Sequence, residues 1–496
     1  MDKIKEVLLF DSRIKAIVKS KIIIEQALTF EDVLIVPKYS DIDSRKNVDI
    51  RSNLTPKIKL NIPMVSGNMD SVTESKMAIT MARLGGIGII HRYLPIKDQV
   101  SEVLKTKRAE AIIIDKPYTL SSKHTMRDAK SLMEEFNITG IPIVTDIGKY
   151  EGILTRRDMM FEDNLSKSVS EIMSNKNNSI TADFGIDVET AKKILRENKI
   201  EKLPLLDKEG ILKGLITAKD LMRKDQYPLA LKDEKGKLLV GAAIGVKGDY
   251  IERAEALVNA GCDVLCIDIA HGHSKLAIDA LKNIKDRFSD IEIIAGNVAT
   301  EEATMDLINA GADCIKGGLG SGATCTTRLV TGAGYPQFSL ILKCAKVSNE
   351  VGIPLMADGG IGGLAGNFSK AIAAGASIVM RSRSLAGTDE SPGLAIMRNG
   401  KKYKIYRGSA SFGANMARNQ RNNQVIDEEY NPEGVEALVH YSGGVEEVIK
   451  PFLAGLRSGM SYVGAHNIKE FWVKAEFVRI TQAGIKESYP HHVELI

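Results

Sequence analysis

A single cysteine stands at the end of a glycine-rich segment, and two threonines follow it directly. The segment runs Gly317-Gly-Leu-Gly-Ser-Gly-Ala-Thr-Cys325-Thr-Thr-Arg328. Glycines carry no Cβ, so backbone N–H groups can close around an anion there. A thiol beside hydroxyl groups that transfer protons is typical of a covalent nucleophile, although most cysteines are small buried hydrophobic residues. The segment makes Cys325 a candidate nucleophile, and the rest of the chain decides between the two interpretations.

Composition narrows the class of protein. A chain of 496 residues predicts two or three domains. The net charge of +4, with acids and bases interspersed, argues against nucleic acid as the main partner. No apolar run approaches the ~20 residues of a membrane helix, and the charged N-terminus does not resemble a signal peptide. We therefore expect a cytoplasmic protein without a membrane partner, which suits the five unpaired cysteines, Cys262, Cys266, Cys314, Cys325 and Cys344.

An internal repeat lies in the first half of the chain. Ala129 reappears as Ala191, a shift of 62 positions (191 − 129), and the same shift relates Gly152-Ile-Leu-Thr-Arg-Arg-Asp158 to Gly214-Leu-Ile-Thr-Ala-Lys-Asp220. The repeat resembles a tandem pair of cystathionine-β-synthase-type (CBS) modules. That resemblance implies that Thr155, Asp158, Thr217 and Asp220 hold the ribose of an adenine or guanine nucleotide. The alternative is that these residues only cap helices.

Short apolar strands alternate with helical stretches on both sides of the repeat. After it, strands are predicted at 238–245, 263–268, 292–296, 314–316, 353–357 and 377–381, with a helix at 250–261. This alternation predicts an α/β protein, a closed (β/α)8 TIM barrel. We expect the barrel to begin in residues 1–106, to be interrupted by tandem CBS modules at 107–224 (about 107–170 and 171–224), and to resume over 225–496.

Polar residues gather where these strands end. Asp268, Asn297, the Cys325 segment and Asp358 all follow predicted strands. Chemistry in such barrels lies at the C-terminal ends of the strands. The sequence therefore predicts that these residues share one site.

With these residues in view, the chain resembles the IMP dehydrogenase / GMP reductase family over nearly its whole length. The matching motifs are Thr29-Phe-Glu-Asp-Val33, Asn68-Met-Asp70, Gly85-Gly-Ile-Gly88, Asp268-Ile-Ala-His-Gly272, Gly296-Asn297, the Cys325 segment, Ala357-Asp-Gly-Gly360, Leu385-Ala-Gly-Thr-Asp-Glu390, Tyr406-Arg-Gly408, Pro432-Glu-Gly434 and Gly455-Leu-Arg-Ser458.

The resemblance implies a chemistry and a set of roles. The Cys325 thiolate would attack C2 of a purine nucleotide, GMP or IMP, and the covalent adduct would exchange hydride with NAD(H) or NADP(H). Thr327 would relay protons and Glu433 would contact the base. The ribose and phosphate would be held by Asp358, Gly359, Gly360, Ser382, Arg383, Tyr406, Gly408 and Asn68, and the nicotinamide by Asp268, Asn297, Gly318 and Gly320. A potassium ion could sit on Gly320, Gly322 and Cys325, completed by Glu487.

A mobile flap is expected between Tyr406 and Glu433, and its sequence bears on the reaction. In the dehydrogenase branch an Arg-Tyr pair there activates water to hydrolyse the adduct. Here Asn422 follows Arg421, and no tyrosine occurs before Tyr430. The missing pair favours a GMP reductase (GMP and NADPH to IMP and ammonia). The alternative is an IMP dehydrogenase (IMP, NAD and water to XMP and NADH) in which Arg421 activates the water.

The phosphate site also departs from the family pattern. Ala323 stands where the family has a phosphate-binding serine, and Ser382-Arg383 replaces a Gly-Ser clamp. We expect a guanidinium, from Arg383 or Arg381, to take over, since its planar fork suits phosphate.

Two further classes of protein remain as alternatives. One is a nucleotide sensor without catalysis, in which only the tandem modules bind ligand. The other is a flavin-dependent barrel enzyme, for which the sequence offers no N-terminal flavin site. Resemblance also implies a homotetramer, or an octamer when the modules bind nucleotide.

Overall fold

The computed structural model describes residues 23, 26–109, 113–115, 117–136, 138–219, 221, 226–421, 431–491 and 493–494, with the side chains of 417–421 excepted. Eight parallel strands close into a barrel, which confirms the predicted fold. Their order around the barrel is β4 (Met64–Ser66), β5 (Ile87–Ile90), β12 (Gly241–Ile244), β13 (Val264–Ile267), β14 (Glu292–Val298), β15 (Cys314–Gly317), β16 (Leu355–Asp358) and β17 (Ile378–Arg381).

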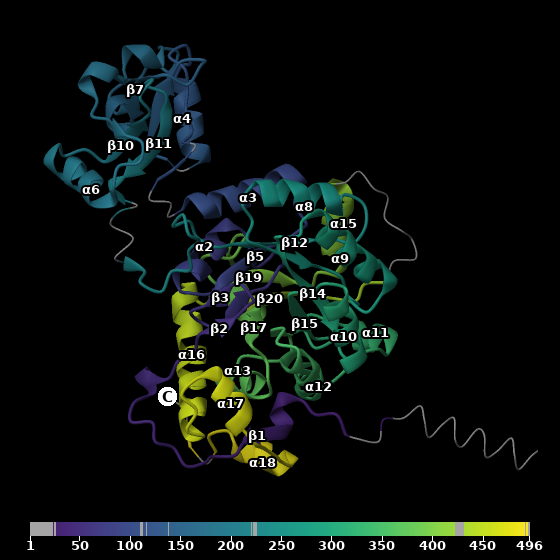
Figure 1. Ribbon diagram of the computed structural model, residues 1–496. Helices are drawn as coiled ribbons and strands as arrows, with labels where there is room; N and C mark the ends of the chain where they lie inside the picture. The colour runs from purple at the N-terminus through teal and green to yellow at the C-terminus, as the bar shows by residue number, and fades with distance from the viewer. Residues whose placement is uncertain are drawn as a thin grey trace, which may run out of the picture.

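Each barrel strand is followed by a helix on the outside, as Figure 1 shows. These helices are α2 (Ser75–Arg83), α3 (Ile96–Arg108), α8 (Tyr250–Asn259), α9 (Lys275–Arg287), α10 (Glu301–Asn309), α12 (Gln337–Glu350), α13 (Ala365–Ala373) and α16 (Val445–Tyr462). The predicted helix at 250–261 and all six strands predicted after the repeat are present, with ends shifted by at most three residues.

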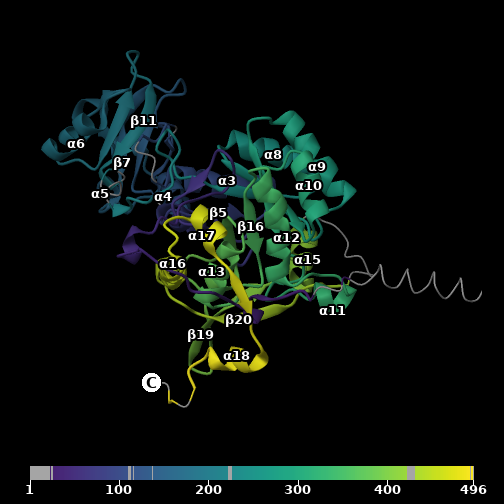
Figure 2. The same cartoon turned by 60° about the horizontal axis from the view of Figure 1, so that its bottom comes forward.

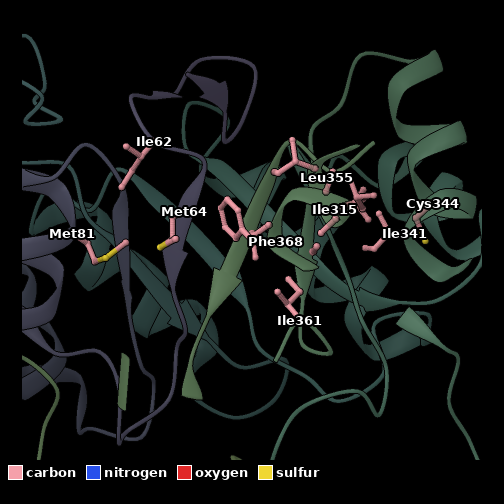
Figure 3. Close-up of a cluster of buried hydrophobic side chains, with 14 of the residues drawn as sticks. Ile62, Met64, Met81, Ile315, Ile341, Cys344, Leu355, Ile361 and Phe368 are labelled. Carbon is pink, nitrogen blue, oxygen red and sulfur yellow. The ribbon is translucent and has the colours of Figure 1, made fainter. Parts of the chain in front are cut away.

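Along each barrel strand, successive side chains alternate between two apolar layers. One residue set fills the barrel interior, for example Cys266, Cys314 and Met356. The neighbouring residues face outward and pack under the helices, for example Ile315 and Leu355. Figure 3 shows part of this outer core, where strand residues lie beside Ile341 and Cys344 of α12. Successive side chains of a strand point to opposite faces, so this alternation fixes which polar residues face the interior.

The barrel closes across the inserted segment. Strand β5, before the insertion, pairs directly with β12, after it, with Gly241 opposite Ile89. The last helix before the insertion, α3, ends at Arg108, two residues beyond the boundary expected from the sequence. Lys107 of that helix forms ion pairs with Asp233 (2.8 Å) and Asp263 (3.0 Å), and so joins it to the segment that returns to the barrel.

The inserted segment is a lobe beside the barrel in both orientations (Figures 1 and 2). It contains two copies of one unit, and each main element recurs 62 positions later: α4 (Met126–Glu135) as α6 (Val188–Glu197), β6 (Gly140–Val144) as β10 (Lys202–Leu206), and β7 (Tyr150–Thr155) as β11 (Leu212–Thr217). Each copy forms its own three-stranded sheet and its own buried core. The sequence repeat is therefore a structural repeat.

A small three-stranded sheet lies on either side, in sequence, of the segment that was expected to be a flap. Strand β19 (Lys401–Arg407) pairs with β18 (Ile396–Arg398) and β20 (Glu436–His440). Tyr406 thus belongs to a strand, and the flap proper can begin only after it. Helix α15 (Phe412–Arg421) follows, and residues 422–430 lie outside the described part of the chain.

The remaining elements are all short. They are β1 (Val33–Ile35), which pairs with β21 (Phe477–Arg479), β2 (Ser52–Asn53), β3 (Lys59–Leu60), α5 (Arg156–Met159), β8 (Ser174–Asn175), β9 (Ala182–Asp183), α11 (Thr327–Thr331), α14 (Arg383–Ala386), α17 (Ile468–Lys474), α18 (Gln482–Glu487) and the 3-10 turns η1 (Phe30–Asp32), η2 (Arg45–Asn47), η3 (Val169–Glu171) and η4 (Lys176–Asn178). None of the described helices is long and apolar enough to cross a membrane.

Candidate active site

A cavity of about 540 Å³ opens at the C-terminal ends of the barrel strands. Its wall collects most of the residues that the sequence singled out, although they are scattered along the chain. From the catalytic and substrate sets these are Cys325, Thr327, Glu433, Asp358, Gly359, Gly360, Ser382, Arg383, Tyr406, Gly408 and Asn68, and from the nicotinamide and potassium sets Asp268, Asn297, Gly318, Gly320 and Gly322.

Cys325 differs from the other four cysteines. Its side chain is partly exposed, and its sulfur lies 3.1 Å from the hydroxyl oxygen of Thr327. The other four are buried. Burial raises the pKa of Cys262 to about 12 and the pKa of Cys266 and Cys344 to about 11. Those thiols stay neutral at physiological pH, which leaves Cys325 as the accessible nucleophile.

Backbone hydrogen bonds bring Glu433 to the cysteine segment. The N–H of Thr326 donates to the carbonyl of Glu433 (2.9 Å), and the N–H of Val435 donates to the carbonyl of Thr324 (2.9 Å). The N–H of Glu433 in turn donates to Ala410 (3.1 Å). A residue more than a hundred positions away in sequence is thus held beside the nucleophile by main-chain contacts.

A buried amide, which sequence reasoning missed, anchors the same segment from below. Gln337 is 2% exposed at the start of α12. Its amide nitrogen donates to the carbonyls of Gly317 (3.0 Å) and Asp358 (3.1 Å), and its oxygen accepts from the hydroxyl of Ser321 (2.9 Å). One side chain therefore joins the ends of β15 and β16 to the cysteine segment. The only signal in the sequence was a polar residue at the start of an apolar helix.

The strand ends are packed so tightly that a glycine is needed at position 318. A Cβ at Gly318 would overlap the carbonyl oxygen of Asp358. Gly359 and Gly360 have φ values of +84° and +72°, in the left-handed region that favours glycine. These glycines let the two loops above β15 and β16 approach each other.

Asp358 is held by two neighbours. Its carboxylate accepts a hydrogen bond from the amide of Asn297 (3.0 Å), and the ammonium of Lys316 lies 3.6 Å away. Lys316 is 3% exposed and also lines the cavity, but it was not predicted as a site residue. The sequence did offer one indication of its role, since Lys316 is a charged residue inside a strand that is otherwise apolar.

Asp268 has its own cation. Arg92, which follows β5, donates to its carboxylate at 2.8 Å, and the hydroxyl of Tyr93 lies 3.4 Å from the same oxygen. Burial alone would raise the pKa of Asp268, but Arg92 and then Lys316 outweigh it and the pKa is lowered. Asp268 is therefore a carboxylate in the site.

The two arginines near the expected phosphate position have different environments. Arg381 is 5% exposed, donates to the carbonyl of Gly362 (2.7 Å) and lies over the ring of Phe452. Burial, and then the charge of Arg383, lower its pKa to about 10. Arg383 is exposed at the cavity wall and makes no hydrogen bond or ion pair within the described part of the chain. Arg381 thus already contacts other groups of the protein, and Arg383 is better placed to bind an anion.

Tyr406 closes the cavity on the side of the small sheet. Its hydroxyl lies 3.6 Å from the sulfur of Met69, and burial raises its pKa to about 12. Arg407, next in β19, pairs with Asp70 of the motif that also contains Asn68. The small sheet is therefore fastened to the loop after β4.

Several predicted residues lie elsewhere. The side chain of Arg421 and the whole of Asp220 are outside the described residues. Glu487, at the end of α18, lies apart from α11 in both views, and no described contact joins it to the cysteine segment (Figures 1 and 2). In the inserted lobe, Asp158 accepts hydrogen bonds from the backbone and hydroxyl of Thr155 (both 2.7 Å). That pair caps α5.

Known proteins with similar sequences agree with the motifs. The family described as IMP dehydrogenase / GMP reductase domain matches residues 27–491. A protein named inosine-5′-monophosphate dehydrogenase from Nitrosopumilus maritimus (strain SCM1) is 49% identical over 477 residues, which cover 95% of this chain and 99% of the relative. The protein of that name from Aquifex aeolicus (strain VF5) is 49% identical over 476 residues, covering 95% and 96%.

A solved structure is similar over the same length. The crystal structure of a GMP reductase variant from Trypanosoma brucei, in complex with guanosine 5′-monophosphate, has a TM-score of 0.89 at 41% identity and covers 95% of this chain and 99% of that one. The match spans barrel and inserted lobe alike. Proteins of this family act on purine mononucleotides with nicotinamide cofactors. The chain belongs to the IMP dehydrogenase / GMP reductase family, and it is an NAD(P)-dependent oxidoreductase.

Proposed function

We propose that this protein is an IMP dehydrogenase that oxidises C2 of the purine through Cys325. The observation that carries the proposal is the partly exposed thiol of Cys325, 3.1 Å from the hydroxyl of Thr327, in a cavity that also contains Asp358 and Glu433. The direction of the reaction follows the relatives named as dehydrogenases, which are 49% identical, against 41% for the reductase structure. The flap had favoured the reductase, and this preference now has less support than the alternative.

In this proposal the thiolate of Cys325 forms a bond to C2 of IMP, and the hydrogen of C2 leaves as hydride. A bound nicotinamide cofactor supplies the two-electron acceptor. Water then replaces the sulfur at C2, which yields XMP and frees Cys325. Thr327 takes up or relays the proton that leaves Cys325 or the attacking water, because its hydroxyl lies within hydrogen-bond reach of the sulfur. Glu433 is held next to this point by the bond from Thr326.

The rest of the wall suits a mononucleotide. Asp358 can accept two hydrogen bonds from ribose hydroxyls, as a carboxylate does. Gly359, Gly360 and Ser382 would leave room for the phosphate, and Tyr406, Gly408 and Asn68 line the same cavity. For the nicotinamide, amide and carboxylate groups are available in Asn297 and Asp268, beside Gly318 and Gly320. In this proposal NAD accompanies the dehydrogenase direction, and NADPH accompanies the reductase direction.

We assign the phosphate contact to Arg383 rather than Arg381. Arg381 already donates to Gly362 and to the hydroxyl of Ser384 (3.2 Å), whereas Arg383 is exposed at the wall. Arg383→Ala should weaken nucleotide binding by about 1.5–3 kcal/mol, the value of a hydrogen bond to a charged group. Titration calorimetry with IMP measures this, and Arg398→Ala, exposed in β18 away from the cavity, is the matched control.

A GMP reductase is the second candidate. Two observations favour it: the flap carries no Arg-Tyr pair, and the reductase of Trypanosoma brucei shares the fold with a TM-score of 0.89. In that case Cys325 would form a bond to C2 of GMP and ammonia would leave, and hydride from NADPH would then reduce the adduct to IMP and free Cys325. The adduct is not hydrolysed in this reaction, so no residue has to activate water, which accounts for the missing pair. In the dehydrogenase direction Arg421 is the first candidate to activate water.

One experiment separates the candidates. Absorbance at 340 nm is followed in two parallel reactions, IMP with NAD and potassium, and GMP with NADPH. A rise in the first establishes the dehydrogenase. A fall in the second, with ammonia released, establishes the reductase and overturns the proposal. No change in either, with nucleotide still bound to the inserted lobe, favours the sensor that lacks catalysis. Purified protein that is yellow would instead indicate a flavin.

We further propose that the two copies in the inserted lobe are CBS modules that bind an adenine or guanine nucleotide. The support is the exact structural repeat at a shift of 62 residues and the similarity to a Trypanosoma brucei reductase in complex with guanosine 5′-triphosphate, at 37% identity and a TM-score of 0.79. Thr155, Asp158, Thr217 and Asp220 are the proposed contacts. A homotetramer or octamer, a cytoplasmic location, and a potassium ion on Gly320, Gly322 and Cys325 belong to the same proposal.

A further inference from the structure

A lysine is buried at the centre of the candidate active site, with a carboxylate on either side. Lys316 points into the barrel, because it is two residues from Cys314, which belongs to the interior layer. Asp268 and Asp358 stand in the same relation to Cys266 and Met356 of that layer. The three charged side chains therefore form the next layer above the apolar interior, at the floor of the cavity.

The two carboxylates at this floor, Asp268 and Asp358, differ in the cations that contact them. Asp268 is paired with Arg92 at 2.8 Å, whereas Asp358 has Lys316 at 3.6 Å and the neutral amide of Asn297 at 3.0 Å. The other groups that face Lys316 or its partners are the thiol of Cys266 from β13 and the hydroxyls of Tyr93 and Tyr406. Lys316 is thus the one cation, within the described residues, that contacts Asp358.

Burial by itself would remove the charge from Lys316. The neighbouring Cys266, Asp358 and Asp268 outweigh that effect, and its pKa is raised. The cation and the two carboxylates therefore stabilise one another's charged forms. A buried ion of this kind is costly unless it is paired, so its presence next to a nucleotide site calls for a role.

We propose that Lys316 is a positioning residue whose positive charge, placed between Asp268 and Asp358, lets both carboxylates bind the substrates at slightly acidic pH. This rests on the proposed function, because it assigns the carboxylates to ribose and nicotinamide. Lys316 itself needs no contact with either substrate. Its effect reaches the reaction through the two carboxylates: without Lys316, Asp268 would keep Arg92, whereas Asp358 would keep only the neutral amide of Asn297.

The variant Lys316→Gln tests the charge while keeping a hydrogen-bond donor. An opposite charge within about 4–6 Å lowers a carboxyl pKa by roughly 1–3 units. We therefore expect the acid limb of kcat/KM against pH to move up by about 1–2 pH units in Lys316→Gln, with activity recovering at high pH. Lys316→Arg should restore the limb, and Lys346→Met, an exposed lysine of α12, should leave the profile unchanged.

A loss of activity that is equal at every pH, with the limb unmoved, would overturn the proposal. Binding of IMP and of GMP is measured by calorimetry across the same pH range, which does not depend on turnover. If the wild-type protein turns over neither nucleotide, the proposed function fails, while a shifted pH dependence of binding in Lys316→Gln still supports Lys316. Should Lys316→Gln not fold, Lys316→Arg with the same two profiles decides, since a displaced limb there would contradict a role for the charge alone.

Discussion

The sulfur of Cys325 lies 3.1 Å from the hydroxyl oxygen of Thr327, the first residue of the short helix α11 that follows the cysteine segment. General acid–base groups contribute about 10²–10⁴-fold to rate. We expect Thr327→Val to lower kcat by about that factor with little change in nucleotide binding, and Thr327→Ser to keep most of the activity. Steady-state kinetics and calorimetry test this. A Thr327→Val enzyme with wild-type kcat would remove Thr327 from proton transfer.

Reactivity toward alkylating agents should single out Cys325. Burial raises the pKa of Cys262 to about 12 and of Cys266 and Cys344 to about 11, and raises the pKa of Cys314 well above its usual value. At pH 8 these four are neutral and covered. Mass spectrometry after brief treatment with iodoacetamide should find one modified cysteine, and none in Cys325→Ala. Labelling of Cys314 in folded protein would contradict this description.

The amide of Gln337 should stabilise both the fold and the site. Gln337→Ala leaves the hydroxyl of Ser321 and two carbonyls without their partner, and an unsatisfied buried group costs about 1–3 kcal/mol. We expect a lower melting temperature and a reduced kcat. Gln482→Ala, at an exposed position in α18, serves as the control. An unchanged melting temperature in Gln337→Ala would show that the loop is held without it.

A methyl group at position 318 should separate the two loops above β15 and β16. Because the Cβ would overlap the carbonyl of Asp358, Gly318→Ala must displace β16 or the cysteine segment. We expect soluble protein with activity reduced at least tenfold, which corresponds to about 1.4 kcal/mol of barrier. Gly366→Ala in α13, where a Cβ meets nothing within 4 Å, should be neutral or slightly stabilising. Equal activity in both variants would contradict the close packing.

Strand alternation in the sequence predicted the barrel and placed Asp268, Asn297, Cys325 and Asp358 at one end of it, because each follows a run of apolar residues. The supporting residues were not predicted. Lys316 and Gln337 are polar positions inside apolar elements, and only three-dimensional packing shows what faces them. Tyr406 was placed in the flap because motif spacing does not reveal the pairing of β19 with β20.

The direction of the reaction was the harder question for a physical reason. Both candidate reactions share the nucleophile, the ribose carboxylate and the nicotinamide side. They differ in how the adduct is resolved, which depends on a few groups in the flap, between α15 and Glu433. A motif missing from one loop says little about which other group might take its place, whereas identity over the whole chain averages over every position.

The direct pairing of β5 with β12 has a consequence for how such a protein can change over evolutionary time. All eight strands keep their neighbours whatever chain is threaded between α3 and β12. None of the eight strands that close the barrel therefore comes from the inserted lobe. A lineage could therefore exchange, lose or acquire the inserted lobe in a single genetic event and keep every strand pairing of the barrel.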